Sequence, residues 1–342
     1  MQASLAHRLC RPGLSWIAVS LLVSACGGSG GAAINSPIPD PPGPVPTARY
    51  VSGPLLQGSG TVIVDGRELT LARGTEAGVE SLRYQELVRS YLVIRPQLTG
   101  VPRPVLLILH GNGGNPQGMA NVAETSDLVG TRGVIAVLPS ARDQQWSENP
   151  SDPRGVDDVG FIAGVVAALK QTTQVDDQRI YLAGFSNGGA MVQRYACADP
   201  DGFAGYGVVS AVLRPAVAAN CITSPARPIA YMLGTDDPVV AYGGVNGVSS
   251  AASSTAFWVS AQHCGQQQQE SLPDSSNDGT ATQLSRYRGC TAGSEVRLYS
   301  IQGGGHAWPG GVQQGTFSSN GRTPMDFSAT EQLRQFFSAY SN

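Results

Sequence analysis

The chain has 342 residues, a formal net charge of −3 and only 14% charged side chains. A weakly acidic chain of this kind lacks the basic face of a nucleic-acid-binding protein, so we expect no nucleic-acid partner. No apolar run reaches the roughly 18 residues that a transmembrane helix needs. Hydrophobic residues make up 41%, enough for a sizeable core, and the length permits a single large domain.

Residues 1–25 have the pattern of an export signal, because basic residues precede an apolar stretch that ends in small residues. The stretch Leu22–Cys26 is similar to a bacterial lipobox, in which the cysteine becomes acylated. The alternative is an ordinary cleavage nearby that leaves Cys26 unmodified. Residues 26–50 are rich in Gly and then in Pro, which predicts a tether. We therefore expect an exported chain, either anchored through Cys26 and facing the periplasm or cell exterior, or secreted.

Four cysteines follow Cys10 and Cys26 in the chain: Cys197, Cys221, Cys264 and Cys290. An even number of cysteines in an exported chain predicts two disulfide bonds. Three connectivities are possible, of which the pairing of sequence neighbours closes two loops of similar, modest size. The cysteine spacings match no zinc motif, so we expect no metal site, and we expect no cofactor.

The elements of the expected fold alternate between strands and helices from about residue 90 onward. The predicted strands are a hairpin over 61–71 around an Asp-Gly turn, followed by 90–95, 104–109, 133–138, 179–185, 207–211, 228–233 and 295–301. The predicted helices are 116–128, 157–170, 187–197, 252–262 and 326–340. This alternation predicts one α/β domain over 51–342, with a mostly parallel central sheet and helices on both faces.

Two segments carry no such pattern. Residues 140–154 form a long polar segment that contains a tryptophan, and they are expected to be a loop. Residues 265–283, rich in Gln, Ser and Asp, are expected to be a solvated insertion loop.

The motif G-x-S-x-G occurs at Gly184–Gly188, between a predicted strand and a predicted helix. This context is the one in which a serine nucleophile sits on a sharp turn, with its hydroxyl above the sheet. The following helix directs its N-terminal N–H groups toward the site, which favours a developing oxyanion. We therefore expect Ser186 to be a catalytic nucleophile.

A serine nucleophile needs a base and an orienting acid. In α/β-hydrolases the acid follows the serine in the chain, and the histidine comes on a loop after the last strand. Only His306 has both the order and the position. The acid is expected after strand 228–233, where Asp236 and Asp237 are equally suited by sequence alone.

The expected oxyanion hole has two backbone N–H donors. One belongs to Asn187, directly after the serine, and the other to the glycine-rich loop after strand 104–109, at Asn112 or alternatively Gly111. Trp146 and Trp308 are candidates for the wall of a substrate pocket, although either tryptophan could simply pack under a loop.

Asp157 and Asp158 stand at a helix start and are expected to cap it rather than to take part in catalysis. His110, at the end of a buried strand, is expected in the loop that faces the serine.

With these residues in place, the chain resembles the polyhydroxybutyrate depolymerase and feruloyl esterase-like family of secreted α/β-hydrolases, which is similar to carbohydrate esterase family 1. The resemblance covers most of residues 90–340 and rests on five stretches: Leu109–Gly114, Val156–Phe161, Arg179–Gly189, Gly234–Val240 and Gly303–Gly311. It implies the α/β-hydrolase fold and selects Asp237 over Asp236 as the acid. It also favours the disulfides Cys197–Cys221 and Cys264–Cys290.

The chain departs from the family pattern at two positions, where Leu233 replaces a frequent His and Ala241 a frequent Pro. Neither position belongs to the expected triad, so the departures concern the shape of the pocket.

The resemblance implies a serine esterase that acts on hydroxyalkanoate, feruloyl or acetyl-polysaccharide esters. The alternatives are a catalytically silent binding protein on a hydrolase scaffold, and a related serine peptidase or acyltransferase.

Overall fold

The computed structural model describes residues 51–342, apart from 53–54, 98–99, 246 and 313–319. The expected signal peptide (1–25), the tether (26–50) and the lipid site at Cys26 lie outside the described residues. All described residues belong to one compact unit. None of the helices in this part of the chain is both long and apolar enough to cross a membrane.

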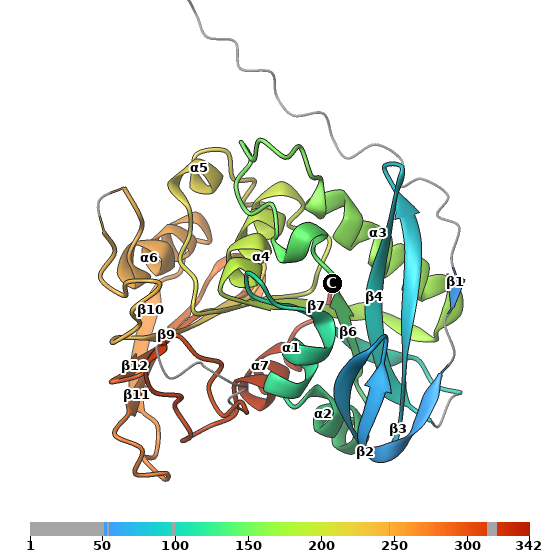
Figure 1. Cartoon of the computed structure of the whole chain (residues 1–342). Helices are drawn as coiled ribbons and strands as arrows, with labels where there is room; N and C mark the ends of the chain where they lie inside the picture. Colours follow the sequence, from blue (N-terminus) through green and yellow to red (C-terminus); the bar gives the residue numbers. More distant parts are fainter. Residues whose placement is uncertain (1–50, 53–54, 98–99, 246, 313–319) are drawn as a thin grey trace, which may run out of the picture. The chain divides into compact units, whose positions relative to one another are not determined.

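A 12-stranded mixed sheet organises the described residues (Figure 1). Its centre consists of parallel neighbours in the order β6, β5, β7, β8, β9, β12. Their bounds are Ile135–Pro139 (β6), Arg103–Leu109 (β5), Val175–Phe185 (β7), Tyr206–Val209 (β8), Ile229–Gly234 (β9) and Val296–Gln302 (β12). Strands β6, β8 and β9 are buried along their whole length, as strands covered on both faces must be. The predicted α/β fold is thereby confirmed.

Antiparallel strands extend both edges of the sheet. One edge adds β4 and β3, with β1 and β2 both paired to β3; the other edge adds β11 and then β10. Their bounds are Val51–Ser52 (β1), Leu56–Val64 (β2), Arg67–Tyr84 (β3), Leu87–Pro96 (β4), Gln266–Ser271 (β10) and Ala281–Arg288 (β11). The hairpin predicted around Asp65–Gly66 is confirmed: both turn residues have positive φ, as a tight hairpin turn requires.

The expected solvated loop at 265–283 is wrong in part. Residues Gln266–Ser271 form β10, which pairs along its whole length with β11, and only the connection between the two strands is irregular. All six residues of β10 are exposed. A strand at the sheet edge with no buried face carries no apolar alternation, so its sequence gives no sign of the strand.

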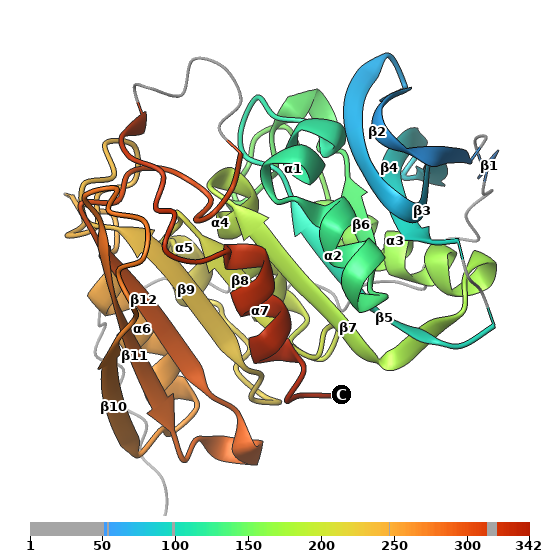
Figure 2. The same ribbon diagram turned by 90° about the horizontal axis from the view of Figure 1, so that it is seen from below.

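Helices cover both faces of the sheet (Figures 1 and 2). One face carries α1 (Pro116–Val122), α2 (Thr125–Arg132) and α7 (Ala329–Phe337), which share one buried apolar cluster. The other face carries α3 (Asp158–Thr172), α4 (Asn187–Ala198), α5 (Pro215–Ala218) and α6 (Ala251–Ala261), which share a second cluster. Short 3-10 turns lie at Arg142–Gln144 (η1) and Thr291–Gly293 (η2).

The single helix expected over 116–128 is two helices. Glu124 adopts a left-handed conformation with φ of 48° and separates α1 from α2. The Thr125 hydroxyl donates a hydrogen bond to the Ala120 carbonyl at 3.2 Å, which satisfies a carbonyl near the end of α1. The break lets Met119 of α1 and Val129 of α2 reach the same core.

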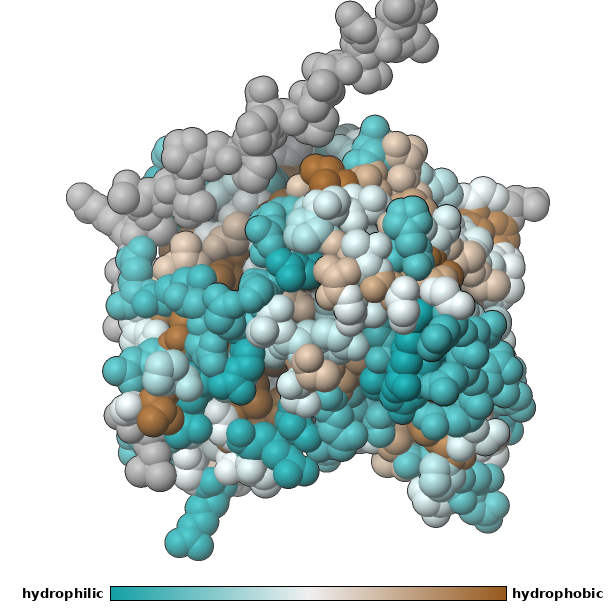
Figure 3. All heavy atoms as spheres, turned by 180° about the vertical axis from the view of Figure 1, so that it is seen from behind, coloured by the Kyte–Doolittle hydropathy of each residue, from teal (hydrophilic) through white to brown (hydrophobic). Residues whose placement is uncertain are grey.

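Two disulfide bonds join Cys197 to Cys221 and Cys264 to Cys290. This is the pairing of sequence neighbours that the resemblance favours. On the face opposite to that of Figure 1, apolar side chains are scattered among polar ones rather than joined into one large patch (Figure 3).

Candidate active site

Ser186 lies at the turn between β7 and α4, with φ of 55° and ψ of −120°. A non-glycine residue in this conformation is strained and occurs where surrounding contacts hold it. The flanking glycines allow the chain to pass closely. A Cβ atom on Gly184 would lie 2.4 Å from the carbonyl oxygen of Gly188, and one on Gly188 would lie 2.5 Å from the carbonyl oxygens of Leu109 and His110. The turn therefore depends on glycine at both positions.

Ser186, His306 and Asp237 form one chain of hydrogen bonds. The distance from His306 Nε2 to Ser186 Oγ is 2.8 Å, and that from His306 Nδ1 to Asp237 Oδ2 is 2.7 Å. An ionised carboxylate only accepts hydrogen bonds, so the Asp237 contact places the ring proton on Nδ1. Nε2 is then left to accept the proton of the serine hydroxyl.

The structure separates the two aspartates that follow β9. Asp237 is buried, with 7% of its surface exposed, and its Oδ1 accepts hydrogen bonds from the backbone N–H groups of Val239 and Val240, both at 2.8 Å. Asp236 is exposed, and its side chain accepts a hydrogen bond from the Thr235 hydroxyl. Only Asp237 is in contact with His306, in agreement with the choice that the resemblance makes.

The loop that carries His306 is held by groups that the sequence does not point out. The Ser210 hydroxyl donates to the Ala307 carbonyl at 3.0 Å, and the His306 N–H donates to the Asn320 carbonyl at 2.6 Å. The Phe185 ring lies with its centroid 5.0 Å from that of the His306 ring. Ser210 has a positive φ of 50°, a backbone feature that leaves no signature in a single sequence.

The glycine-rich loop after β5 lies beside Ser186. Two N–H groups of this loop are already hydrogen-bonded: that of Gly113 donates to the Gln144 carbonyl, outside the loop, and that of Gly114 donates to the Gly111 carbonyl. Gly111 and Asn112 both line the cavity that contains Ser186. Their two N–H groups therefore remain the candidates for one oxyanion donor, with the N–H of Asn187 at the start of α4 for the other.

His110 is buried beneath this loop. Its Nε2 accepts a hydrogen bond from the Ala141 N–H at 3.2 Å, so Nδ1 must carry the ring proton, which it donates to the Gly111 carbonyl at 2.7 Å. Burial lowers the pKa of His110 below its ordinary value of 6.5. His110 is therefore a neutral imidazole that supports the loop through hydrogen bonds.

The two tryptophans have different positions. Trp308 lines the cavity and donates its indole N–H to the Thr330 hydroxyl at 3.0 Å. Trp146, expected as a possible pocket wall, is 1% exposed and does not line this cavity. Its indole N–H donates instead to the His110 carbonyl at 2.9 Å. The expectation for Trp146 is corrected to its alternative, a tryptophan packed under a loop.

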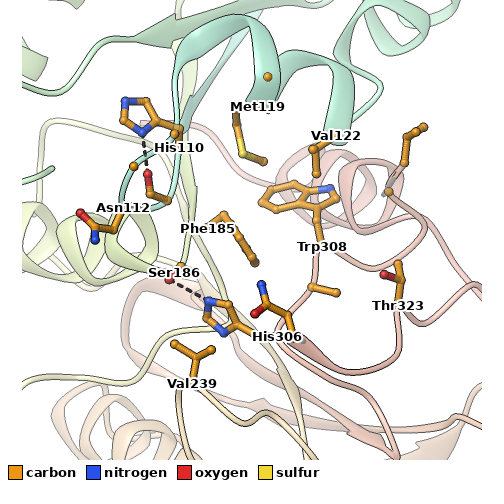
Figure 4. A pocket seen from close by; sticks show the side chains of 18 of the residues that line it. His110, Asn112, Met119, Val122, Phe185, Ser186, Val239, His306, Trp308 and Thr323 are labelled. Carbon is orange, nitrogen blue, oxygen red and sulfur yellow. Dashed lines mark hydrogen bonds between the residues drawn. The ribbon is translucent and has the colours of Figure 1, made fainter. Parts of the chain in front are cut away.

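A cavity of about 650 Å³ opens beside Ser186 and His306. Met119 of α1, Phe185 at the end of β7 and Trp308 in the loop after β12 point into it (Figure 4). Val122, Val239 and Val312 extend the apolar part of the lining, and Asn112, Asn115, Asn320 and Thr323 supply polar groups. Met119 and Val122 belong to a short helix whose apolar pattern does not separate pocket residues from core residues.

The aspartates at the start of α3 have structural roles, but only Asp157 is the expected cap. The Asp157 side chain caps the helix by accepting from the Gly160 N–H at 2.9 Å. Asp158 is fully buried and pairs with Arg89 at 2.7 Å. Among the described residues, no group of three or more His, Cys, Asp or Glu side chains is placed to hold a metal ion.

Comparison with known proteins bears on the class of protein to which this chain is similar. No profile of a known protein family matches the chain. The chain is 28% identical over 329 residues to NocK of Nocardia uniformis subsp. tsuyamanensis, a protein assigned as an esterase, and the match covers 87% of this chain and 90% of NocK.

Two further relatives are fungal. Feruloyl esterase B of Piromyces equi is 27% identical over 219 residues, which cover 60% of this chain and 39% of that protein. The bifunctional acetylxylan esterase/xylanase XynS20E of Neocallimastix patriciarum is 23% identical over 227 residues, covering 66% of this chain and 32% of that protein. The chain thus spans less than half the length of these two relatives.

Among solved structures, acetyl xylan esterase from Aspergillus awamori matches 73% of this chain and 94% of its own, with a TM-score of 0.56 and 12% identity. At this identity the match bears on the fold alone. The fold and the relatives together define a carboxylic ester hydrolase with the α/β-hydrolase fold. Within that class, the chain is similar to enzymes named as feruloyl esterases. The polyhydroxybutyrate depolymerase part of the resemblance stays a prediction.

Proposed function

We propose that this protein is an exported serine esterase that uses Ser186, His306 and Asp237 as its catalytic triad. The observation that carries the proposal is the unbroken hydrogen-bond chain between these three residues beside a cavity of about 650 Å³. The strained conformation of Ser186 supports it further, because such strain collects at functional sites.

The first half of the reaction transfers the acyl group to Ser186. Ser186 Oγ attacks the ester carbonyl carbon and gives its proton to His306 Nε2, while the carbonyl electron pair moves onto the oxygen. The resulting oxyanion is held by the Asn187 N–H and by the N–H of Asn112 or Gly111. The carbon–oxygen bond to the alcohol then breaks, and the alcohol leaves with the proton from His306.

The second half releases the acid. A water molecule gives a proton to His306 Nε2 and attacks the acyl-enzyme, and Ser186 Oγ leaves with that proton. In both halves Asp237 keeps the imidazole oriented and stabilises its protonated form. The two backbone N–H groups on Asp237 Oδ1 hold the carboxylate in place.

The cavity favours a neutral acyl group with a sizeable apolar body. Its described lining contains no Asp, Glu, Lys or Arg side chain. Met119, Phe185 and Trp308 form an apolar wall against which an aromatic acid can pack. The asparagines at the lining suit the hydroxyl groups of a sugar that forms the alcohol part of the ester. We therefore place feruloyl-type esters first, ahead of acetylated polysaccharides and hydroxybutyrate oligomers.

The substrate assignment is tested by comparing kcat/KM for methyl ferulate, acetylated xylan and 3-hydroxybutyrate oligomers. We expect methyl ferulate to be turned over best by the wild type. A preference for either of the other two substrates would overturn the feruloyl assignment. No turnover of any ester would overturn the proposed function.

A variant that narrows the cavity tests the acyl pocket. Val122→Phe adds a ring at the half-buried wall, so we expect it to lower kcat/KM for methyl ferulate while leaving p-nitrophenyl acetate unaffected. Equal losses on both esters would contradict the position of the acyl group.

Export and anchoring are part of the proposal. The two disulfides support export, since such bonds persist in oxidising compartments. We propose that Cys26 carries a lipid that holds the enzyme at a membrane. Cys26→Ala should then move the protein from the membrane fraction to the soluble exported fraction, and an unchanged distribution would contradict the anchor.

A further inference from the structure

Beyond the residues that touch substrate, segment 140–147 connects both halves of the candidate oxyanion hole. The first half is the loop that starts at His110, and the second is Asn187 at the beginning of α4. These two halves come from β5 and β7, so their relative position is not fixed by one stretch of chain. Segment 140–147 is hydrogen-bonded to both.

The contacts to the first half involve three residues of the segment. The Ala141 N–H donates to His110 Nε2 at 3.2 Å, and the Gln144 carbonyl accepts from the Gly113 N–H at 2.9 Å. The Trp146 indole N–H donates to the His110 carbonyl at 2.9 Å. Gly111 and Asn112 lie in the chain between His110 and Gly113, the two loop residues that these hydrogen bonds hold.

The contacts to the second half come from the backbone of Trp146. Its N–H donates to Asn187 Oδ1 at 2.7 Å, and its carbonyl accepts from Asn187 Nδ2 at 3.2 Å. The amide side chain of Asn187 is thus fixed at both ends. A single residue, Trp146, therefore binds the His110 half of the candidate oxyanion hole through its indole and the Asn187 half through its backbone.

A buried ion pair fixes both ends of the segment. Arg89 and Asp158 are 2.7 Å apart, and their side chains are 6% and 0% exposed. Arg89 also donates to the Ser140 carbonyl at 3.1 Å, and Asp158 accepts from the Ser147 N–H at 2.6 Å. The Arg89 guanidinium lies 3.5 Å above the centre of the Phe161 ring, which restricts it further.

We propose that Trp146 is a positioning residue that holds the two oxyanion donors at a fixed separation. This inference rests on the proposed function, because the role it gives to Trp146 is a role in that catalysis. The Trp146 side chain itself does not line the cavity. Catalysis by an oxyanion hole depends on donors that are already in place when charge develops. Loosening Trp146 should therefore raise the energy of the transition state more than that of the bound substrate.

The test compares two tryptophan variants that lose the same kind of hydrogen bond. Trp146→Phe removes the indole N–H and keeps an aromatic ring. Trp258→Phe is the matched control. Trp258, in α6, is also buried and donates its indole N–H to the Tyr231 hydroxyl at 2.7 Å. Both variants lose a buried hydrogen bond, so a purely structural effect should appear in both.

For Trp146→Phe we expect kcat on p-nitrophenyl butyrate to fall about 10- to 100-fold, as for a small misplacement of catalytic groups, while KM changes less than about 3-fold. Affinity for an aryl boronic acid, which forms a tetrahedral adduct with the serine, should fall in parallel with kcat/KM. Trp258→Phe should keep the wild-type kcat and boronic acid affinity.

A second variant keeps the proposal open to refutation if Trp146→Phe does not fold. Asn187→Ala removes the side chain held by Trp146 but keeps the backbone N–H, so it should show the same loss in kcat and in boronic acid affinity. Wild-type kcat in a folded Trp146→Phe or Asn187→Ala enzyme would overturn the inference. A similar fall in kcat for Trp258→Phe would also overturn it. A wild type without esterase activity would overturn the proposed function together with this inference.

Discussion

Replacing Gly188 with alanine should strain the turn that carries Ser186. The added Cβ would lie 2.5 Å from two backbone carbonyl oxygens, those of Leu109 and His110, about 0.9 Å inside the 3.4 Å at which ordinary contact begins. These backbone atoms lie at the end of the central strand β5 and cannot move away without disturbing the sheet. Overpacking of this kind typically costs about 1–3 kcal/mol, and with two backbone contacts we expect a cost of about 3 kcal/mol for Gly188→Ala.

Gly164→Ala is the matched control, because it makes the same chemical change inside α3. There the new Cβ would be 3.8 Å from the Leu82 side chain, an ordinary contact. Alanine is preferred to glycine in a helix interior, so Gly164→Ala should stabilise the protein by about 0.4–1 kcal/mol.

Thermal unfolding of the oxidised protein measures both changes. At about 1.6 °C per kcal/mol for a domain of about 290 residues, Gly188→Ala should lower Tm by about 5 °C and Gly164→Ala should raise it slightly. Gly188→Ala should also lose esterase activity, because the atoms it displaces lie at the start of the oxyanion loop. A Gly188→Ala protein with wild-type Tm and activity would refute the close approach of α4 to β5.

Three further predictions concern the acid, a disulfide and a buried histidine. Asp237→Asn should lower kcat by about 10⁴ and Asp236→Asn should leave it nearly unchanged; the reverse order would contradict the choice of acid. Replacing Cys264 and Cys290 together by serine should lower the unfolding free energy by about 3 kcal/mol, since the bond spans a sequence separation of 26, and urea unfolding that does not change would oppose this. Burial lowers the pKa of His110 below 6.5, so the unfolded state binds a proton that the folded state does not, and stability is lost as the pH falls below about 6.5. Urea unfolding at pH 7.5 and 5.5 should show a smaller loss for His110→Gln than for the wild type, and equal losses would exclude this role of His110.

The sequence predicts the central sheet well because its strands are continuous apolar runs. The strands predicted at 104–109 and 179–185 lie within β5 and β7. The edges of the sheet are harder to predict. Strand β10 is polar throughout and exposed. Its pairing with β11 comes from backbone hydrogen bonds, which leave no pattern in the side chains. The division between α1 and α2 depends on the left-handed backbone of Glu124, for which a glutamate gives no sign.

Some residues of the candidate site could be predicted from the sequence, and others could not. Ser186 stands in a local motif, and chain order selects His306, so both could be found from the sequence. The choice of Asp237 over Asp236 as the acid depends on which of the two side chains turns toward His306. Trp146 and Ser210 act through hydrogen bonds to distant backbone carbonyls. Such contacts join segments far apart in the chain, so only a structure can bring them together.

The most direct test of the account is covalent labelling of the oxidised wild-type protein with a fluorophosphonate, followed by peptide mapping. We predict one label, on Ser186, formed together with loss of ester hydrolysis, and no label in a folded Ser186→Ala variant that is equally inactive. Labelling at another residue, or hydrolysis that survives in Ser186→Ala, would contradict the assignment of Ser186, His306 and Asp237 as the catalytic triad.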